Sequence, residues 1–320
     1  MPTVECKNCK ATTAVDLKLS VGQPSAKVVS ALPKAQFLMI TWTAAETGAM
    51  CTVFGGGKYY FNKSSDQNLT PLLIPGLSKA SGEDYHAHFF QTKVNDKSMV
   101  CLKSEFHPKV QTAATTMFFE KIIGSGANPK FKYAITSGTS GGIWKSLDIG
   151  DAVVTNRARY GFTMPQDKQN LLFSGVNNIT GSTSPADSAT WYDYVNKQIL
   201  ADDTCVNTGL AASGGRKAGG KPAIYYQSSG SNVTDVVTNE RLSDDEYGKI
   251  SSYRKIGATL DENDAYVAEA FEAVQFSNWV SIRNVSDLPS PVNNDDQYET
   301  FGLCSSLNGA YAAWAFVMGH

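Results

Sequence analysis

The 320-residue sequence has no long hydrophobic run and no block of like charge. No apolar stretch approaches the roughly 20 residues that a membrane-spanning helix needs. Lysine and arginine number 28 against 30 acidic residues, a net charge of −2, and no basic run resembles a nucleic-acid footprint. The first residues lack a basic stretch followed by an apolar one, so we expect no signal peptide and a cytoplasmic location. Nucleic acid and membrane are therefore not expected as partners.

Cysteine and histidine are scarce, with six and four residues, and the cysteines are irregularly spaced. Cys6 and Cys9 have the spacing of half a zinc site or of a redox pair. No second such pair and no His-x-x-x-His follows. We expect mostly reduced, structural cysteines, no metal site and no cofactor.

Segments rich in Val, Ile, Phe and Tyr alternate with segments of helical periodicity. Several of the former are apolar without alternation, as buried parallel strands are. We expect an α/β fold with a largely parallel sheet. The strands are expected near residues 36–43, 98–103, 131–137, 151–155, 222–228 and 278–283, and the helices near 109–123, 188–201, 264–276 and 297–317.

The domain organisation follows from composition. Residues 1–35 are polar and mixed, and we expect an extension ahead of a single domain at 36–320. Two stretches rich in turn residues, at about 55–97 and 161–221, are expected as surface insertions.

Two of the expected strands end in polar turns that carry a carboxylate. Glu46 follows the first strand, and Asp287 follows the last. In an open α/β sheet, ligands bind beyond the carboxyl ends of the strands, so these two side chains are expected on one crevice. Two carboxylates in one crevice suit acid–base chemistry.

A glycine-rich stretch at 137–142 is expected as a turn whose backbone N–H groups bind a ligand, or as an ordinary tight turn. It also matches Gly-x-Ser-x-Gly, the pattern of a serine nucleophile, at Ser140. That nucleophile needs a helix directly after it and a later histidine, and the only later histidine is the final residue, His320. We therefore do not expect a serine hydrolase. The segment 215–222 imitates a P-loop, but Pro222 stands where a hydroxyl is needed.

Two further charged residues are ambiguous. Glu272, after Phe271, lies in an otherwise apolar helical run, and it either leans out to solvent or accepts hydrogen bonds from a ligand. Arg283 either forms a structural ion pair with Asp287 or binds a hydroxyl or an anion.

Taken in order, these segments resemble the purine nucleoside phosphorylase and nucleosidase superfamily. The match is closest to its 5′-methylthioadenosine/S-adenosylhomocysteine nucleosidase branch. That resemblance implies a three-layer α/β/α fold with a mostly parallel mixed sheet, a small nucleoside as substrate, and a homo-oligomer. The segments that carry the resemblance are 40–46, 137–142, 149–154, 158–160, 271–273 and 283–287.

The resemblance also implies roles for individual residues. Asp287 would protonate the leaving purine at N7, and Glu46 would orient or deprotonate the attacking water. The residues expected to line the substrate site are Glu272, Phe271 and Arg283 around the ribose, Thr139 and Gly141 on the nucleophile side, Ser286 beside Asp287, and Val233 toward the base.

The sequence departs from the phosphorylases of this superfamily, which hold phosphate with arginines. The first turn, 41–45, has no arginine, and Thr136 stands where another would be. We therefore expect a purine nucleoside N-ribosylhydrolase that uses water. One alternative is a phosphorylase whose cations come from Arg157, Arg159, Arg216 or Lys217. The other is a non-catalytic nucleoside-binding or storage protein of the same fold. The acidic, His-containing stretch of the nucleosidases is replaced here by 161–164, which puts 5′-thio specificity in doubt.

Overall fold

The computed structural model describes most of the chain, and all structural statements below concern this part of it. The described residues are 17–61, 68–109, 112–124, 129–169, 171–181, 188–200, 221–226, 234–239, 249–288 and 294–320.

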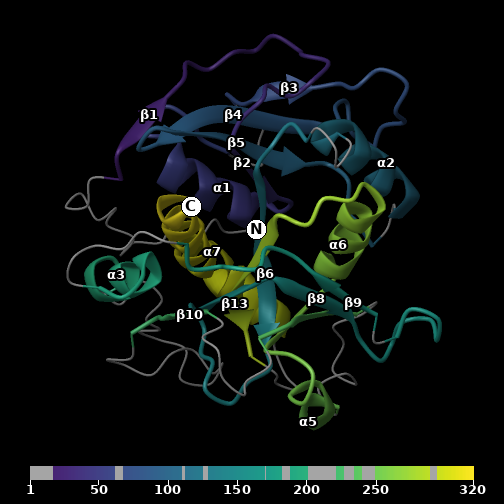
Figure 1. Ribbon diagram of the computed structural model, residues 1–320, viewed down its shortest axis with the longest axis vertical. Helices are drawn as coiled ribbons and strands as arrows, with labels where there is room; N and C mark the ends of the chain where they lie inside the picture. The colour runs from purple at the N-terminus through teal and green to yellow at the C-terminus, as the bar shows by residue number, and fades with distance from the viewer. Residues whose placement is uncertain are drawn as a thin grey trace.

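Four parallel strands form the centre of the molecule, in the order β5-β2-β6-β13 (Figure 1). The residues of β2, Phe-Leu-Met-Ile-Thr, are all buried, as expected for a strand covered on both faces. The bounds are β2 (Phe37–Thr41), β5 (Lys97–Ser104), β6 (Tyr133–Gly142) and β13 (Trp279–Asp287).

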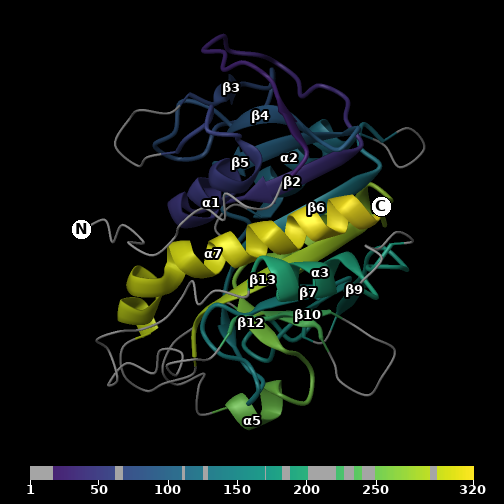
Figure 2. The ribbon, with the colours of Figure 1, turned by 90° about the vertical axis from the view of Figure 1, so that its left-hand side faces the viewer.

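Helices cover both faces of this central sheet. Phe37 and Met39 pack in one hydrophobic cluster with α1 (Ala44–Phe54), α3 (Trp191–Gln198) and α7 (Asn294–Gly319). Leu38 and Ile40, which point the other way because strand side chains alternate, pack in a second cluster with α2 (Thr112–Ile123) and α6 (Asp264–Ala273). Figure 2 shows α7 lying lengthwise along the sheet. The arrangement is a three-layer α/β/α fold.

Antiparallel strands extend the parallel centre on both sides. Beyond β5, β4 pairs antiparallel with it, and β1 and β3 both pair with β4. On the other side, β13 pairs with β7, and the end of β6 pairs with β12. The bounds are β1 (Leu19–Val21), β3 (Thr70–Leu72), β4 (Ala87–Val94), β7 (Ala152–Thr155), β8 (Arg157–Tyr160), β9 (Leu172–Ser174), β10 (Ile224–Tyr226), β11 (Val236–Thr238) and β12 (Thr259–Asp261), with the short helix α5 (Ile250–Tyr253).

The α/β fold and its central elements agree with the sequence-based expectation, whereas two regions differ. The stretch 55–97 is not wholly a surface excursion, because β3 and β4 belong to the sheet and Phe89 and Phe90 are buried. Within the expected extension 1–35, β1 pairs with β4. The sequence did not predict these strands, because turn-forming residues surround them and outweigh their short apolar runs when a segment is judged by its composition. The segments 1–16 and 201–220 lie outside the described residues.

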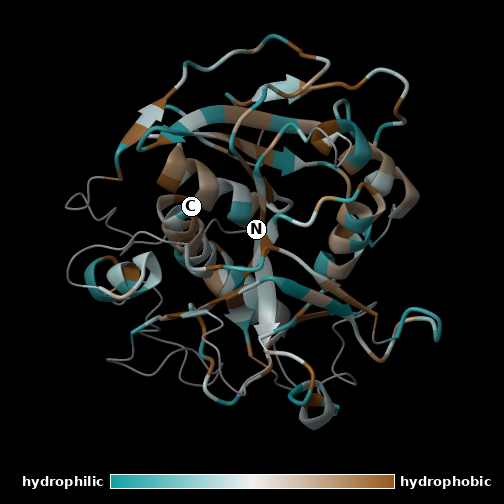
Figure 3. Ribbon diagram, in the orientation of Figure 1, coloured by the Kyte–Doolittle hydropathy of each residue, from teal (hydrophilic) through white to brown (hydrophobic). Residues whose placement is uncertain are grey.

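Hydropathy follows the layers. In Figure 3, much of α3 and of the loop between β8 and β9 is hydrophilic, and both lie at the periphery. None of the helices in the described residues combines the length and apolar character that crossing a membrane requires.

The cysteines agree only in part with the expectation. Cys51 and Cys101 are free and buried, and burial raises the pKa of Cys51 to about 12. Cys304 is disulfide-bonded, contrary to the expectation of reduced cysteines. Cys6 and Cys9 lie outside the described residues.

Candidate active site

Charged and polar side chains gather where the central parallel strands end. Glu46 lies on the first turn of α1, directly after β2, and Asp287 is the last residue of β13. Both are buried, with 5% and 8% of their surfaces exposed. The end of β6 lies between β2, which precedes Glu46, and β13, which carries Asp287. This is the edge of the sheet at which α/β proteins bind ligands.

Glu46 accepts four hydrogen bonds, two within the start of α1 and two from β6. Its Oε2 accepts from the backbone N–H groups of Trp42, at 3.0 Å, and Thr43, at 2.9 Å. Thr43 in turn caps the helix with its side chain, and the two residues form a capping box. The other oxygen, Oε1, accepts from the N–H of Thr139 at 2.8 Å and from its hydroxyl at 3.1 Å. The carboxylate is thereby fixed at the crevice.

The glycine-rich stretch 137–142 is a strand and not the expected turn. It continues β6, pairing in parallel with β13 over most of its length and antiparallel with β12 at its end. Ser140 lies within the strand and its hydroxyl donates to the backbone oxygen of Asn284, so there is no nucleophile elbow. Glycine is needed at 138, where a Cβ would lie 2.1 Å from Nη1 of Arg283. The glycines therefore serve the close approach of Arg283 to the strand.

Arg283 is held by two aspartates at the centre of the fold. Its Nε donates to Asp264 Oδ2 at 2.7 Å, and its Nη2 donates to Asp264 Oδ1. The same Nη2 lies 3.0 Å from Asp261 Oδ2. Ser281 donates its hydroxyl to Asp264, and Thr238 donates to Asp261 Oδ1 at 2.6 Å. Of the two alternatives for Arg283, the ion pair with Asp287 is not the one formed among the described residues, where Asp261 and Asp264 pair with Arg283.

The cluster carries one more negative than positive charge when all three groups are ionised. Burial raises the pKa of Asp261 to about 7, because the Arg283 charge compensates for it only in part and the Asp264 charge adds to it. Burial alone would lower the pKa of Arg283, but the two aspartates outweigh this effect and raise it. Arg283 therefore stays charged, while burial makes protonation of Asp261 easier than in an exposed aspartate.

Asp287 is oriented by its neighbour. The Ser286 hydroxyl donates to Asp287 Oδ1 at 2.7 Å. The pairing of β13 with β6 shifts register between Val285 and Asp287, so that Asp287 lies opposite Gly141. Such a bulge changes the direction of the following side chain and is common beside active sites.

Tyr298, on the first turns of α7, is near enough to both candidate catalytic carboxylates for their charges to act on it. Its side chain forms a hydrogen bond with Thr43, and the charges of Glu46 and Asp287 both act on it. Burial, followed by these two charges, raises its pKa. The hydroxyl therefore stays protonated at neutral pH and can donate a hydrogen bond.

The structure brings together six of the nine expected site residues and places two of them, Phe271 and Glu272, elsewhere. Phe271 packs in the core against Phe119 and Phe276. Glu272 is exposed and lines a separate cavity of about 280 Å³ with Trp279 at the opposite end of α6. Val233 lies outside the described residues. The residues brought together are Glu46, Thr139, Gly141, Arg283, Ser286 and Asp287.

The placement of Glu272 is a correction with a geometric cause. The helix rises about 1.5 Å per residue, so Glu272 lies about 12 Å along α6 from Asp264, the residue that meets Arg283. Asp261 and Asp264 were missed because the segment Thr259–Asp261 was not recognised as a strand. The signal was present, since an acidic residue at the end of an apolar strand is the same pattern that identified Glu46 and Asp287. Nothing in the sequence pointed to Tyr298.

No group of three or more His, Cys, Asp or Glu side chains in the described residues is arranged to hold a metal ion.

The three-layer α/β/α fold and its buried carboxylates together define the class of solved structures with which this chain is compared. The structure is similar to a putative 5′-methylthioadenosine/S-adenosylhomocysteine nucleosidase from Borrelia burgdorferi B31 bound to adenine. The TM-score is 0.56 at 16% identity, over 88% of this chain and 99% of that chain.

Two other solved structures give the same result. The 5′-methylthioadenosine/S-adenosylhomocysteine nucleosidase from Colwellia psychrerythraea 34H, in complex with adenine, has a TM-score of 0.55 at 13% identity, over 90% of this chain and 97% of that chain. The futalosine hydrolase of Helicobacter pylori strain 26695 has a TM-score of 0.55 at 14% identity, over 89% and 98%. No family model and no curated protein matches the chain. The chain has the nucleoside phosphorylase-like fold, as the sequence resemblance implied.

Proposed function

We propose that this protein is a purine nucleoside N-ribosylhydrolase, in which water replaces the purine base at the sugar carbon. The proposal is supported by two buried carboxylates from distant parts of the sequence that both adjoin β6: Glu46 accepts hydrogen bonds from Thr139, and Asp287 lies opposite Gly141. The neighbours of the same fold are named as nucleosidases and a futalosine hydrolase, and two of them hold adenine. At such low sequence identity the similarity shows only the fold, so the proposed activity rests on the residues of this site.

Asp287 is the proposed general acid. Protonation of the purine at N7 makes the base a better leaving group as positive charge develops on the sugar. Ser286 donates to Oδ1 of Asp287 and so fixes the orientation of the carboxyl group that would carry the transferred proton. The bulge at the end of β13 sets the direction of this side chain.

Glu46 is the proposed residue that orients and deprotonates water. Its backbone hydrogen bonds hold one oxygen, whereas the other accepts partly from a rotatable hydroxyl, that of Thr139. A water molecule that takes the place of this hydroxyl would donate to Glu46 and point its lone pair at the sugar. Tyr298 lies beside both carboxylates and offers a further donor.

The ribose is proposed to bind at Arg283 and Asp264 in place of the expected Arg283 and Glu272. Asp264 is buried and already oriented by Arg283 and Ser281. A carboxylate oriented in this way can accept hydrogen bonds from sugar hydroxyls without further reorganisation.

The cations around the site favour water over phosphate. Arg157 and Arg159 lie 3.1 and 3.0 Å from Asp235, whose single negative charge offsets one of their two positive charges, and Arg283 is paired with Asp261 and Asp264. A phosphate dianion needs cations to bind tightly. Arg216 and Lys217 lie outside the described residues, so phosphorolysis stays as the alternative that experiment decides.

Two broader expectations from the sequence remain proposals. A homo-oligomer is proposed from the resemblance to the superfamily, and gel filtration with light scattering tests it. A cytoplasmic location is proposed from the sequence, although the disulfide at Cys304 is typical of an oxidising compartment.

The deciding experiment is release of free base from a panel of purine nucleosides, nucleotides and 5′-methylthioadenosine, each with and without phosphate. We expect release that does not depend on phosphate. Release only with phosphate would establish a phosphorylase. Binding without release from any compound would establish the non-catalytic alternative.

A further inference from the structure

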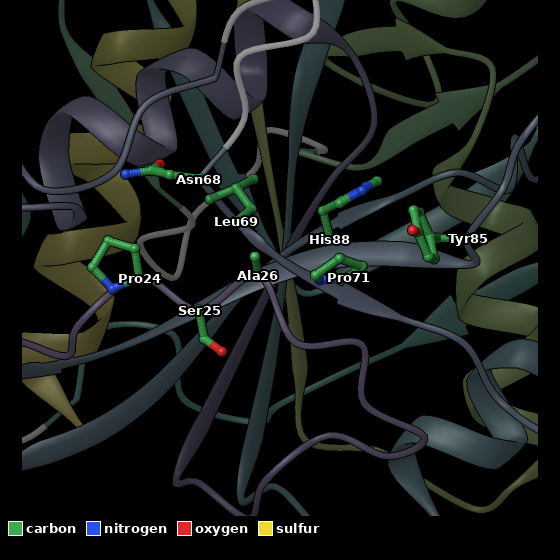
Figure 4. Close-up of a pocket in the computed structure, with 8 residues that line it drawn as sticks. All are labelled: Pro24, Ser25, Ala26, Asn68, Leu69, Pro71, Tyr85 and His88. Carbon is green, nitrogen blue, oxygen red and sulfur yellow. The ribbon is translucent and has the colours of Figure 1, made fainter.

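A cavity of about 420 Å³ lies beside β3 and β4, and none of the candidate active-site residues lines it (Figure 4). Ligand sites in proteins are typically cavities of about 300–1,000 Å³ with mostly apolar walls and a few placed polar groups. Here Pro24, Leu69 and Pro71 supply apolar surface, and Tyr85 and His88 supply two rings with polar atoms. The cavity therefore has the size and the composition of a site for a small organic molecule.

The chain between Gly22 and Val29 borders this cavity as an arch. Gly22 donates its N–H to the Gln91 backbone oxygen of β4 at 3.3 Å, and Val29 donates to the Pro71 backbone oxygen of β3 at 3.0 Å. Residues 23–28 are exposed, and in the described part of the chain they form no hydrogen bond with either strand. The cavity is therefore an opening between the arch and the sheet that a ligand can enter from solvent.

His88 connects the cavity wall to a buried charged network. Its Nδ1 lies 2.8 Å from Oε1 of Glu105, a side chain that is 4% exposed, and Lys103 donates to the other oxygen of Glu105. Burial alone would raise the pKa of Glu105, but the hydrogen bond from His88 and the charge and hydrogen bond of Lys103 outweigh this effect and lower it. Glu105 is therefore an ionised acceptor, and the proton of this hydrogen bond belongs to Nδ1 of His88.

The other ring nitrogen of His88, Nε2, remains available at the cavity. It has no hydrogen-bond partner among the described residues, and it is open to solvent, since the side chain is 13% exposed and Nε2 is not among the buried unpaired atoms. Tyr85 packs edge-to-face against the imidazole, with ring centroids 5.4 Å apart and an interplanar angle of 79°. Glu105 and Tyr85 therefore fix a ring whose second nitrogen is left for a ligand.

The lining residues decide which ligand fits. None of the described residues around the cavity carries a permanent charge, so a buried anion or cation would lack a partner in the wall. Nε2 of His88 accepts a hydrogen bond when the ring is neutral and donates one when the ring is protonated. A hydroxyl group both donates and accepts, so it pairs with Nε2 in either state. An aromatic ring attached to that hydroxyl matches the ring of Tyr85 and the apolar surface beside it.

We propose that this cavity is a second ligand site, which binds an uncharged aromatic alcohol. The hydroxyl group of the ligand pairs with Nε2 of His88, and its ring packs against Tyr85 and Pro71. Glu105 orients His88 and does not touch the ligand. The site is separate from the crevice of the candidate catalytic carboxylates, so the inference goes beyond the proposed function and does not rest on it.

Phenol is the probe for this site, and toluene is its matched comparison, because a methyl group of similar size replaces the hydroxyl group. The sequence has four histidines, so ring ¹⁵N NMR spectra of wild type and of His88→Phe identify the His88 signals. We expect the proton on Nδ1 in the ligand-free protein. Phenol should move the Nε2 signal to that of a hydrogen-bonded nitrogen in a saturable way, and toluene should not.

Affinities measured on variants assign the binding to His88. Backbone amide shifts on β3 and β4 give Kd for both probes. His88→Phe keeps a ring and removes the nitrogens, so we expect phenol to lose about 5-fold or more in affinity relative to toluene, the usual effect of one hydrogen bond. The matched control is His320→Phe, since both ring nitrogens of His320 contact backbone oxygens, those of Phe316 and Asn178, and the residue does not line the cavity. This control should keep the wild-type ratio.

Three results would overturn the inference. The first is a His88 Nε2 signal that phenol leaves in place, and the second is a phenol-to-toluene ratio that His88→Phe does not change. The third is tighter binding of benzoate or benzylamine than of phenol, which would refute an uncharged ligand. The ring spectra of wild type with phenol and toluene need no stable variant, because only the assignment uses one and signals that move with phenol alone already decide the first result. No measurement depends on base release, so this inference and the hydrolase proposal stand or fall separately.

Discussion

At the scale of single residues, the crevice balances buried acidic groups against one guanidinium. Asp261 and Asp264 share Arg283, while Glu46 takes its compensation from backbone and hydroxyl donors. Removing one member of a buried ion pair destabilises the fold by more than the pair contributes to stability, because the remaining charge is left unpaired. Substitutions here must therefore keep shape and hydrogen bonding while changing only charge or a proton.

Asp287→Asn is expected to abolish base release while folding and nucleoside binding persist. The amide keeps the size of the side chain and an acceptor for Ser286, but it cannot donate the proton that the leaving base needs. Release assays, circular dichroism and calorimetry check the three parts. The control is Asp96→Asn, which changes an exposed aspartate on the β4–β5 turn. Turnover near the wild-type rate in Asp287→Asn would remove this residue from the mechanism.

Asp261→Asn is expected to change how stability depends on pH. The pKa of Asp261 is about 7 in the folded protein against an ordinary value of 3.8, so the folded state binds more protons between these values. The free energy of unfolding of wild type should therefore fall, relative to the variant, as the pH rises from about 4 to about 7. Denaturant unfolding of both proteins at pH 4, 5.5 and 7.5 measures this difference. A difference that is constant with pH would contradict the raised pKa.

At the scale of elements, β6 is where the sequence-based expectation failed most informatively. Six residues rich in glycine and serine favour a turn by local propensity. Two strands, β13 and β12, pair with this stretch and hold it extended. Glycine in a strand often marks a place where another group approaches the backbone closely, and Arg283 does so here. Tertiary pairing therefore outweighed local preference.

Gly138→Ala is expected to displace Arg283 and to weaken both fold and activity. The new Cβ would lie 2.1 Å from Nη1 of Arg283 and 3.2 Å from Oε1 of Glu46. Forcing extra volume into a packed site typically costs about 1–3 kcal/mol, and the shift would also disturb the Asp264 pair. Chemical denaturation and base release measure the two effects.

Gly22→Ala is the control for this substitution. Its Cβ would meet its nearest atom, the Gln91 backbone oxygen, at an ordinary 3.5 Å. Equal stability of the two alanine variants would show that the approach of Arg283 to β6 is not tight.

At the scale of the whole molecule, α7 connects the parts that lie far apart in sequence. Its residue Trp314 is 1% exposed, packs edge-on against Trp191 of α3, and donates its N–H to the Leu17 backbone oxygen at 3.1 Å. The same helix carries Tyr298 to the crevice at its other end. Packing of α7 therefore supports both the core and the site.

Trp314→Ala is expected to lower the free energy of unfolding by about 3–5 kcal/mol, the usual cost of removing a buried tryptophan. Met117→Ala on α2, where the side chain is 47% exposed, should change it by less than about 0.5 kcal/mol. Denaturant unfolding of both variants measures the contrast. A small effect at Trp314 would mean that α3 and α7 pack independently.

The sequence by itself predicted the fold class and singled out the two carboxylates as candidates. Apolar strands followed by acidic turns are local patterns that can be recognised directly in the sequence. It also singled out Arg283, because burying a charge at the end of an apolar strand costs free energy unless the charge has a partner. These features depend on residues adjacent in sequence, so no knowledge of packing was needed to find them.

Only the tertiary structure decided which groups meet Arg283 and Glu46. Asp264, and not the expected Glu272, lies beside Arg283, because the start of α6, and not its end, meets β13. Tyr298 comes from the first turns of α7, and no local pattern in the sequence encodes its hydrogen bond with Thr43. Such contacts join positions up to hundreds of residues apart, and the free energy that selects them belongs to the packed molecule as a whole.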